Sequence, residues 1–322
     1  MKQFFKIYNK LGTLIILVLL IVAFTIINPV FFSGKNMINI LKQISIMGIM
    51  AMGMTFVLLT GGIELSMGAQ ISLVCVTVSM FVKNMGMPVV PAMLLSIAFT
   101  TLIGFFNGFL ISKTKVPALI LTLGTSTFLE GFVYTICGGL PVYGLPASLK
   151  WLGQYNLFGF LPVLVIVMAI MVMIAVFILE KTYTGRYFYA IGSNEEATKL
   201  SGVNTDKVGI VAYTLSGLLV GIAGILMLGR VGSGQPGAGK GYEMDVLTGC
   251  VLGGVSTTGG KGKVSNAFLG ILIIGVLSNG MAIAGLGEFP QKMVKGIVLI
   301  IAIVLDRLQF MKVRKKVQVA KG

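Results

Sequence analysis

One charged segment interrupts the apolar sequence between Glu180 and Lys207: EKTYTGRYFYAIGSNEEATKLSGVNTDK. Over the whole 322-residue chain, 56% of the residues are hydrophobic and 11% are charged, against roughly 25% charged in a soluble domain. Several apolar runs on either side of the segment reach the ~20 residues that a helix needs to cross a membrane. The composition therefore predicts an all-α integral membrane protein, in which Glu180–Lys207 connects two membrane spans.

About ten transmembrane helices are expected, and together they form a single transmembrane domain over residues 1–322. The lysines before the first apolar run give it some likeness to a signal peptide, but the run is too long for a signal core. The eighth span is short and lies between glycine-rich segments, so we expect it to be broken or re-entrant. The expected spans are 11–27, 44–60, 66–82, 89–111, 117–137, 158–179, 208–229, 244–256, 264–285 and 292–306.

The distribution of basic residues predicts the orientation of the chain in the membrane. With the N-terminus inside, 17 of the 25 Lys and Arg residues fall on the cytoplasmic side, which also holds Glu180–Lys207. The positive-inside rule then places both termini in the cytoplasm. The net charge of +15 is explained by this topology rather than by nucleic-acid binding, because the basic residues lie between hydrophobic spans.

A faint internal repeat relates residues 44–137 to residues 208–306. If helices 2–5 repeat as helices 7–10, the displacement is five spans, so the two copies have opposite orientations, as in many transporters. Two pairs of motifs indicate the repeat: GGIELS at Gly61–Ser66 with KGYEMD at Lys240–Asp245, and Asn107-Gly108 before Pro117 with Asn279-Gly280 before Pro290.

The connecting segment 181–207 is expected to contain one short helix between about Asn194 and Ser201. Ser193 and Glu196 have the spacing of a capping box, and Gly202 is suited to the left-handed residue that ends a helix. Ala197 and Leu200 would share one face of this helix. That face could enter a groove on another protein, or the helix could be an ordinary amphipathic helix lying on the membrane.

Polar residues within or beside the spans are candidates for the translocation path or for helix caps. A carboxylate at the bilayer centre is costly, so the acids should face protein or water, or lie at the interface where the cost is small. We expect Glu64 and Glu243 to cap half-helices, and the amides to join helices by hydrogen bonds. The candidates are Glu64, Ser66, Gln70, Asn107, Gln235, Glu243, Asp245 and Asn279.

No catalytic or metal-binding residue is expected. The chain has no histidine, and its three cysteines lack metal-ligand spacing. GQPGAGKG at 234–241 is one residue from a phosphate-binding loop, but it lacks the final hydroxyl residue and the preceding strand. We therefore expect a flexible re-entrant loop there, and no ATP or other cofactor bound by this chain.

The sequence resembles the ribose-type permeases, the membrane subunits of ATP-binding-cassette (ABC) importers for monosaccharides, a group related to the branched-chain amino-acid permeases. The likeness covers about Asn28 to Arg307. The segments that carry it are GRYFYAIGSNEEATKLSGVNTDKV, NPVFFSGKNMINILKQISIMGIMAMGMTFVLLTGGIELSMGA, the PVY after Gly139, GSGQPGAGKGYEMDVLTGCVLGGVSTTGGKGKV and KMVKGIVLIIAIVLDR. Two positions differ from the usual pattern: Glu130 stands where arginine is common, and Lys240 where a small residue is common.

The resemblance implies a non-enzymatic permease subunit in a bacterial cytoplasmic (inner) membrane. Its partners would be cytoplasmic ATPase subunits that bind ATP and Mg²⁺, a second permease copy or paralogue, and an extracytoplasmic sugar-binding protein. The short loop helix would dock on the ATPase. The residues that match this coupling element are Gly192, Ser193, Asn194, Glu195, Glu196, Ala197, Leu200, Ser201 and Gly202.

Two other classes of function are less consistent with the sequence. An ion-coupled secondary transporter of a small polar solute would also show inverted repeats, but it needs a buried titratable relay, whereas the acids here cluster near span ends. An intramembrane enzyme needs a constellation of nucleophile and base or paired aspartates, which the spans lack.

Overall fold

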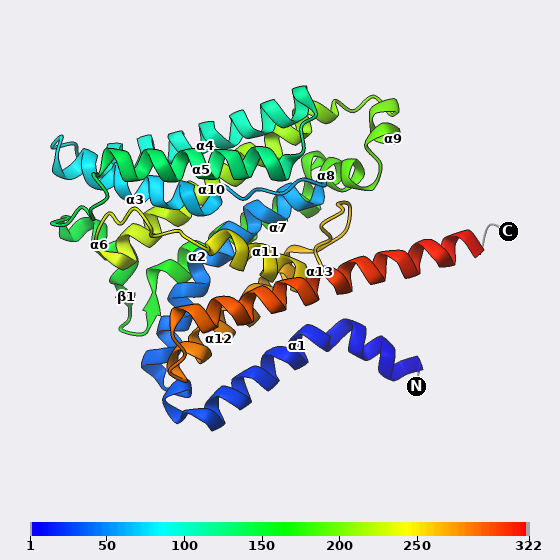
Figure 1. The fold of residues 1–322 in the computed structure, drawn as a ribbon, viewed down its shortest axis with the longest axis horizontal. Coiled ribbons are helices and arrows are strands. Elements are labelled where there is room, and N and C mark those ends of the chain that lie inside the picture. The colour runs from blue at the N-terminus through cyan, green and yellow to red at the C-terminus, as the bar shows by residue number, and fades with distance from the viewer. Residues whose placement is uncertain (1, 320–322) are drawn as a thin grey trace.

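The computed structural model describes residues 2–319, with side-chain surroundings given for residues 12–307. The described chain is almost entirely helical (Figure 1). Its α-helices are α1 (Lys2–Ile27), α2 (Gly34–Leu59), α3 (Met67–Lys83), α4 (Val89–Thr114), α5 (Ala118–Ile136), α6 (Ala147–Gln154), α7 (Val163–Lys181), α8 (Tyr183–Ser193), α9 (Glu195–Leu200), α10 (Thr205–Val231), α11 (Tyr242–Leu252), α12 (Val264–Ile283) and α13 (Glu288–Val319). A short 3-10 helix, η1 (Pro29–Phe32), and two short strands, β1 (Asn156–Leu157) and β2 (Leu161–Pro162), complete the elements.

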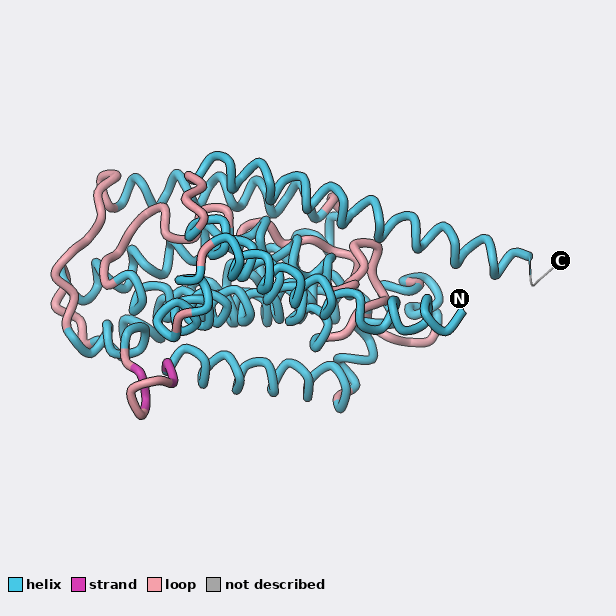
Figure 2. Tube along the Cα trace, turned by 90° about the horizontal axis from the view of Figure 1, so that it is seen from below, coloured by secondary structure: helices cyan, strands magenta, loops and turns pink. Residues whose placement is uncertain are grey.

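Six of the described helices are long and apolar enough to cross a membrane: α2, α4, α5, α7, α10 and α12. Two shorter apolar helical stretches, Gly12–Ile27 and Met67–Lys83, add to these. The long helices run along one axis of the molecule, and most connecting loops gather at its two ends (Figure 2). The structure is therefore that of a helical bundle with several spanning helices.

The helices form two matching sets, α2 to α5 and α10 to α13, and the first helices of the two sets, α2 and α10, contact each other. In the first set α3 contacts α4 and α5, and α10 packs against α3 and α4. In the second set α11 contacts α12 and α13, and α2 packs against α11 and α12. Each of these two first helices thus packs against the later helices of the opposite set, so the sets interlock.

Small residues allow the closest of these contacts. Gly104 and Gly108 of α4 lie against the backbone of α10, where a Cβ on Gly104 would be 2.3 Å from the carbonyl oxygen of Tyr213. Such a surface brings two helix backbones together and gives dispersion contacts over a long stretch. Gly104 and Gly108 are four residues apart in the sequence, so both lie on the face of α4 that meets α10.

Two helices, α3 and α11, are shorter than the six helices that are long enough to cross a membrane. The 11-residue α11 is about 17 Å long, roughly half of the ~30 Å hydrocarbon core. Non-helical segments precede both shorter helices, residues 60–66 before α3 and 232–241 before α11. The eighth expected span, 244–256, is thus a short helix that begins and ends earlier, at Tyr242 and Leu252.

Four helix boundaries differ from those expected by five residues or more: α1 begins at Lys2 rather than at 11, α13 ends at Val319 rather than at 306, and the starts of α2 and α7 also differ. The second expected span began at 44, but α2 begins at Gly34 because the Ser33 hydroxyl accepts the N–H of Asn36 at 3.4 Å and caps a polar first turn. The sixth began at 158, but residues 156–162 form a β-hairpin, whose turn holds Phe158 and Gly159 with positive φ. α7 therefore starts only at Val163.

The beginning of α1, the end of α13 and α9 all lie at the same end of the bundle (Figure 1). The hairpin of β1 and β2 and helix α6 lie at the opposite end. We call the end that holds α9 the α9 end of the bundle. The start of α13 lies at the opposite end, because α13 runs toward the α9 end.

Candidate coupling and translocation site

Two consecutive helices, α8 and α9, make up most of the charged connection. The Thr182 hydroxyl caps α8 by accepting the N–H of Gly185 at 3.2 Å, and the Asn194 side chain caps α9 by accepting the N–H of Ala197 at 2.9 Å. The expected capping box on Ser193 is therefore wrong. Ser193 is the last residue of α8, which leaves Asn194 in the extended conformation that an N-cap requires.

The short helix itself lies where the sequence predicts it. Glu195 and Glu196 are in its first turn and Lys199 is in its last, so both ends carry charges that favour the helix dipole. Gly202 has φ of +85° and ends the helix as expected. Ala197 is exposed and the Leu200 side chain is 89% exposed, so an apolar residue at the tip of α9 makes almost no contact within this chain.

The C-terminal end of α8 is fixed to segments of both helix sets. A Cβ added at Gly192 would lie 2.0 Å from the carbonyl oxygen of Leu59 and 2.3 Å from the amide nitrogen of Gly260. The Tyr189 hydroxyl donates to the carbonyl of Gly262 at 2.9 Å. Leu59 ends α2 and Gly260 lies after α11, so α8 joins two regions that are far apart in the sequence.

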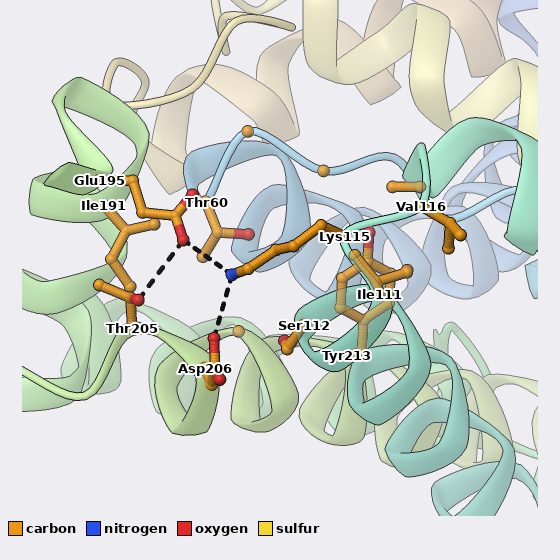
Figure 3. Close-up of a pocket in the computed structure, with 14 residues that line it drawn as sticks. Thr60, Ile111, Ser112, Lys115, Val116, Ile191, Glu195, Thr205, Asp206 and Tyr213 are labelled. Atoms are coloured by element: carbon orange, nitrogen blue, oxygen red, sulfur yellow. Dashed lines mark hydrogen bonds and ion pairs between the residues drawn. The ribbon is translucent and has the colours of Figure 1, made fainter. Parts of the chain in front are cut away.

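Lys115 links α9 to the turn between α4 and α5. Its ammonium group donates to Oε1 of Glu195 at 3.2 Å and to Oδ1 of Asp206 at 3.0 Å (Figure 3). Lys113 reaches the other oxygen of Asp206 at 3.2 Å. Burial alone would lower the pKa of Lys115, but the carboxylates of Asp206 and Glu195 outweigh it and raise the pKa. The ammonium group therefore stays charged at neutral pH.

These ion pairs border a cavity of about 400 Å³ at the α9 end of the bundle, which we call the inner cavity (Figure 3). It reaches from the surface beside α9 to the Tyr213 side chain on α10. The lining residues are Thr60, Gly61, Gly62, Ile111, Ser112, Lys115, Val116, Ala118, Ile191, Glu195, Thr205, Asp206, Gly209 and Tyr213.

Glu64 is buried in a hydrogen-bonded network at the start of α3. Its Oε1 accepts from the Ser66 amide at 2.9 Å and from the Ser66 hydroxyl at 2.5 Å, and its Oε2 accepts from the Asn107 amide at 3.0 Å. Gln70 donates to the Ser66 hydroxyl at 2.8 Å, and Thr125 donates to Asn107 at 2.8 Å. Four of the candidate residues thus form one cluster, with Glu64 accepting backbone and side-chain donors at a helix start.

Glu243 occupies the corresponding place at the start of α11. Its carboxylate lies in the first turn of α11, at the positive end of the helix dipole. A Cβ added at Gly68 would lie 2.0 Å from this carboxylate and 2.5 Å from the carbonyl oxygen of Gly239. The starts of α3 and α11 therefore meet backbone to backbone, and this close approach requires the two glycines.

The remaining candidates lie elsewhere. Asp245 forms an ion pair of 2.6 Å with Lys295 of α13. Asn279 exchanges amide hydrogen bonds of 2.9 and 3.0 Å with Asn36, which joins α12 to α2. The Gln235 side chain donates a hydrogen bond of 3.3 Å to the hydroxyl of the neighbouring Ser233. Asn279 thus holds helices together, as expected for the amides.

Sequence reasoning missed several partners of these residues. Lys115 looked like an ordinary basic residue at a span end, and Asn36 lay outside the expected second span. The two departures from the family pattern, Glu130 and Lys240, contact each other at 3.5 Å. Their opposite charges were the one signal in the sequence that could have paired them.

The fold defines a multi-helix membrane protein that presents a short exposed helix, α9, at one end. Residues 36–303 match the family described as branched-chain amino acid transport system / permease component, and the chain belongs to this family. It is 40% identical over 307 residues to the ribose import permease protein RbsC of Bacillus subtilis (strain 168), covering 95% of each chain.

Further relatives have the same kind of description. The chain is 39% identical over 300 residues to the ribose import permease protein RbsC of Escherichia coli (strain K12), covering 91% of this chain and 92% of the relative. It is 38% identical over 305 residues to the L-arabinose transport system permease protein AraH of Escherichia coli (strain K12), covering 95% of this chain and 92% of the relative. No solved structure matches the chain.

Proposed function

We propose that this chain is the membrane permease subunit of an ATP-driven importer that moves a monosaccharide, ribose or a related sugar, into a bacterial cell. The observation that carries the proposal is the position of α8 and α9. α9 presents exposed Leu200 at its tip, while Gly192 at the end of α8 is fixed between Leu59 and Gly260. Such an element can receive a force from a soluble partner and pass it to both helix sets.

In this proposal the partner is a cytoplasmic ATPase subunit, which binds ATP and Mg²⁺, and the permease itself catalyses no reaction. The residues that contact the partner are those of the coupling element, Gly192 to Ala197 and Leu200 to Gly202. Closure of the ATPases on ATP displaces α9. The displacement reaches the α4–α5 turn through Lys115 and Glu195, and it reaches α2 and the 259–262 segment through Gly192 and Tyr189.

The two matching helix sets support an inverted repeat with ten spans, both termini in the cytoplasm and α9 on the cytoplasmic side of the inner membrane. Interrupted helices whose starts meet between repeats are a usual location for transport pathways. Glu64 and Glu243 fix these starts, and a pair of permease chains, identical or paralogous, would form the complete pathway. An extracytoplasmic binding protein would deliver the sugar.

The names of the relatives support a monosaccharide as the substrate, because ribose and L-arabinose permeases match over nearly the whole chain. An ion-coupled secondary transporter is less well supported. The buried carboxylate of Glu64 accepts its three hydrogen bonds from Ser66 and Asn107, neither of which titrates, so these bonds do not form the titratable relay that such a transporter needs.

The proposal is tested by replacing the exposed leucine of α9. The Leu200→Asp variant should insert normally and lose co-purification of the ATPase subunit, because a charged residue would enter an apolar groove. Leu140→Asp is a matched control, since Leu140 is 71% exposed and lies in the loop after α5, away from α9. Retention of the ATPase by the Leu200→Asp variant would contradict the docking role.

The energy source is tested with the complete transporter in proteoliposomes. Uptake of labelled ribose or arabinose should require ATP inside the compartment that faces α9, and it should persist when the proton gradient is dissipated. Uptake that continues without ATP hydrolysis and stops with loss of the proton gradient would overturn the proposal in favour of a secondary transporter.

A further inference from the structure

A second cavity, of about 420 Å³, lies at the end of the bundle opposite α9, and we call it the outer cavity. It is formed between the start of α11, the first turns of α13 and one side chain of α2. Its lining residues are Gln43, Lys240, Gly241, Tyr242, Met244, Asp245, Thr248, Glu288, Gln291, Lys292, Lys295, Gly296 and Leu299. Its volume is within the range of small-molecule sites in proteins, roughly 300–1,000 Å³.

The outer cavity is built from the same parts as the inner cavity. The inner one includes Gly61 and Gly62 of GGIELS, and the outer one includes Lys240 and Gly241 at the same places in KGYEMD. Both extend to the residues around the proline that follows each Asn-Gly pair. Both also include part of the first helix of the opposite set: four residues of α10 line the inner cavity, and Gln43 of α2 lines the outer one. Each end of the bundle therefore carries one equivalent cavity.

The charges of the outer cavity are compensated. Asp245 pairs with Lys295 at 2.6 Å, Glu288 with Lys292 at 2.6 Å, and Lys240 with Glu130 at 3.5 Å. A site for an ion would leave a charge of one sign without a partner. A neutral solute with several hydroxyl groups is a better match for such a surface.

Hydrogen-bonding capacity remains in the cavity after these pairs are made. The Gln43 side chain makes no hydrogen bond to any of the described residues. Asp245 uses Oδ2 for Lys295, which leaves Oδ1 as an acceptor, and the Thr248 hydroxyl donates to Met244 at 2.6 Å and can still accept. A polyol can both donate to and accept from these groups.

We propose that the outer cavity is the site at which this permease first binds a neutral polyol, such as a monosaccharide, on the side opposite α9. The inner cavity is its counterpart on the side from which the solute leaves. The inference rests on the proposed function for the identity of the solute. It adds the location of a binding site within one chain and the residues that form it: Gln43, Asp245, Thr248 and Lys295.

Gly296 allows the cavity to be filled without disturbing its walls. A Cβ at this position has no heavy atom within 4 Å, and the residue lies inside the helical range of α13. In proteoliposomes that contain the complete transporter, Gly296→Leu should lower the ratio of maximal uptake rate to KM for labelled ribose by about tenfold or more, because it displaces a bound solute. Gly12→Leu in α1 is the matched control, since Gly12 also has open space and does not line the cavity.

Occupancy of the cavity is tested by protection of a cysteine. Cys75 and Cys250 are buried, so Cys137→Ser gives a background of low reactivity. In that background Lys292→Cys should react with a membrane-impermeant thiol reagent added on the side opposite α9, and saturating ribose should slow the reaction by several-fold. Met85→Cys, exposed on the α3–α4 turn, should react at the same rate with or without ribose.

The results separate the two proposals. If the wild-type transporter shows no ATP-dependent sugar uptake, the proposed function fails. If the wild type transports ribose, but Gly296→Leu transports equally well or ribose leaves the Lys292→Cys reaction unchanged, the outer cavity is not the binding site and the inference is overturned.

Discussion

Lys115 and Glu195 are joined by a hydrogen bond of 3.2 Å, which ties the turn after α4 to the first residue of α9. Lys115 also has φ of +55°, a conformation that non-glycine residues seldom adopt and that directs the chain from α4 into α5. The displacement of α9 that we propose would therefore act on the start of α5 without passing through the centre of the bundle.

Removal of the Lys115 ammonium group should uncouple transport from ATP hydrolysis. Lys115→Ala should change the stability by less than about 1 kcal/mol, since the ion pairs are solvent-exposed. The sugar transported per ATP hydrolysed should fall by roughly 2- to 30-fold. Lys113→Ala is the matched control, because Lys113 contacts Asp206 and not Glu195. Equal ratios in the two variants, measured in proteoliposomes, would rule out this transmission route.

Replacement of Glu64 by glutamine should destabilise the start of α3. The glutamine can accept hydrogen bonds on one atom only, so either the donors of Ser66 or that of Asn107 lose a partner. The free energy of unfolding should fall by about 1–3 kcal/mol. Thermal unfolding in detergent would measure this, with Thr127→Val as a control in which only an exposed helical hydroxyl is removed. An unchanged melting temperature would contradict the role of the network.

Addition of a methyl group at Gly192 should displace α8 from its contact with Leu59 and Gly260. In Gly192→Ala the new Cβ would overlap the carbonyl oxygen of Leu59, which belongs to a helix end and cannot move aside easily. Gly124→Ala in α5 adds the same methyl group where no heavy atom lies within 4 Å, and it should behave like the wild type. Limited proteolysis of the 181–207 segment and co-purification of the ATPase would report the displacement. The interpretation fails if both variants give the wild-type pattern.

Removal of one partner of the Asp245–Lys295 ion pair should destabilise the protein far more than removal of both partners. Asp245→Asn leaves a largely buried ammonium group without a counter-charge, and this costs about 3–5 kcal/mol when the partner of a buried ion pair is removed. Asp245→Asn with Lys295→Met removes both charges and should recover most of the loss. A thermal-shift comparison of the single and double variants gives the coupling energy, and additive losses would show that the two residues act independently.

The parts of the structure that depend on local sequence could be predicted. The position of α9 and its end at Gly202 follow from neighbouring residues, because a helix stop needs one left-handed residue. The cap on Ser193 was wrong for a reason that is also local. α8 is amphipathic and continues through Ser193, and no pattern in the sequence separated its last residue from the cap of the next helix.

Where the structure depends on tertiary contacts, individual residues could be predicted from the sequence but the contacts between them could not. Glu64 and Asn107 were each identified, but their hydrogen bond joins residues 43 positions apart, and the spacing does not encode it. Asn36 was outside the expected second span, because hydropathy does not distinguish a polar first helical turn from a loop. Lys115 has the same charge as many residues at span ends, so only the fold shows that it faces Glu195.

The contact at Gly192 has a consequence for the order of events in a transport cycle. Its neighbours on the two sides, the Leu59 carbonyl and the Gly260 amide, are themselves hydrogen-bonded to each other at 3.0 Å. A force on α8 therefore acts on both helix sets at the same time. We expect the two helix sets to change conformation together. The contacts among the backbones of Gly192, Leu59 and Gly260 would then suppress an intermediate in which only one set has moved and through which solute could leak.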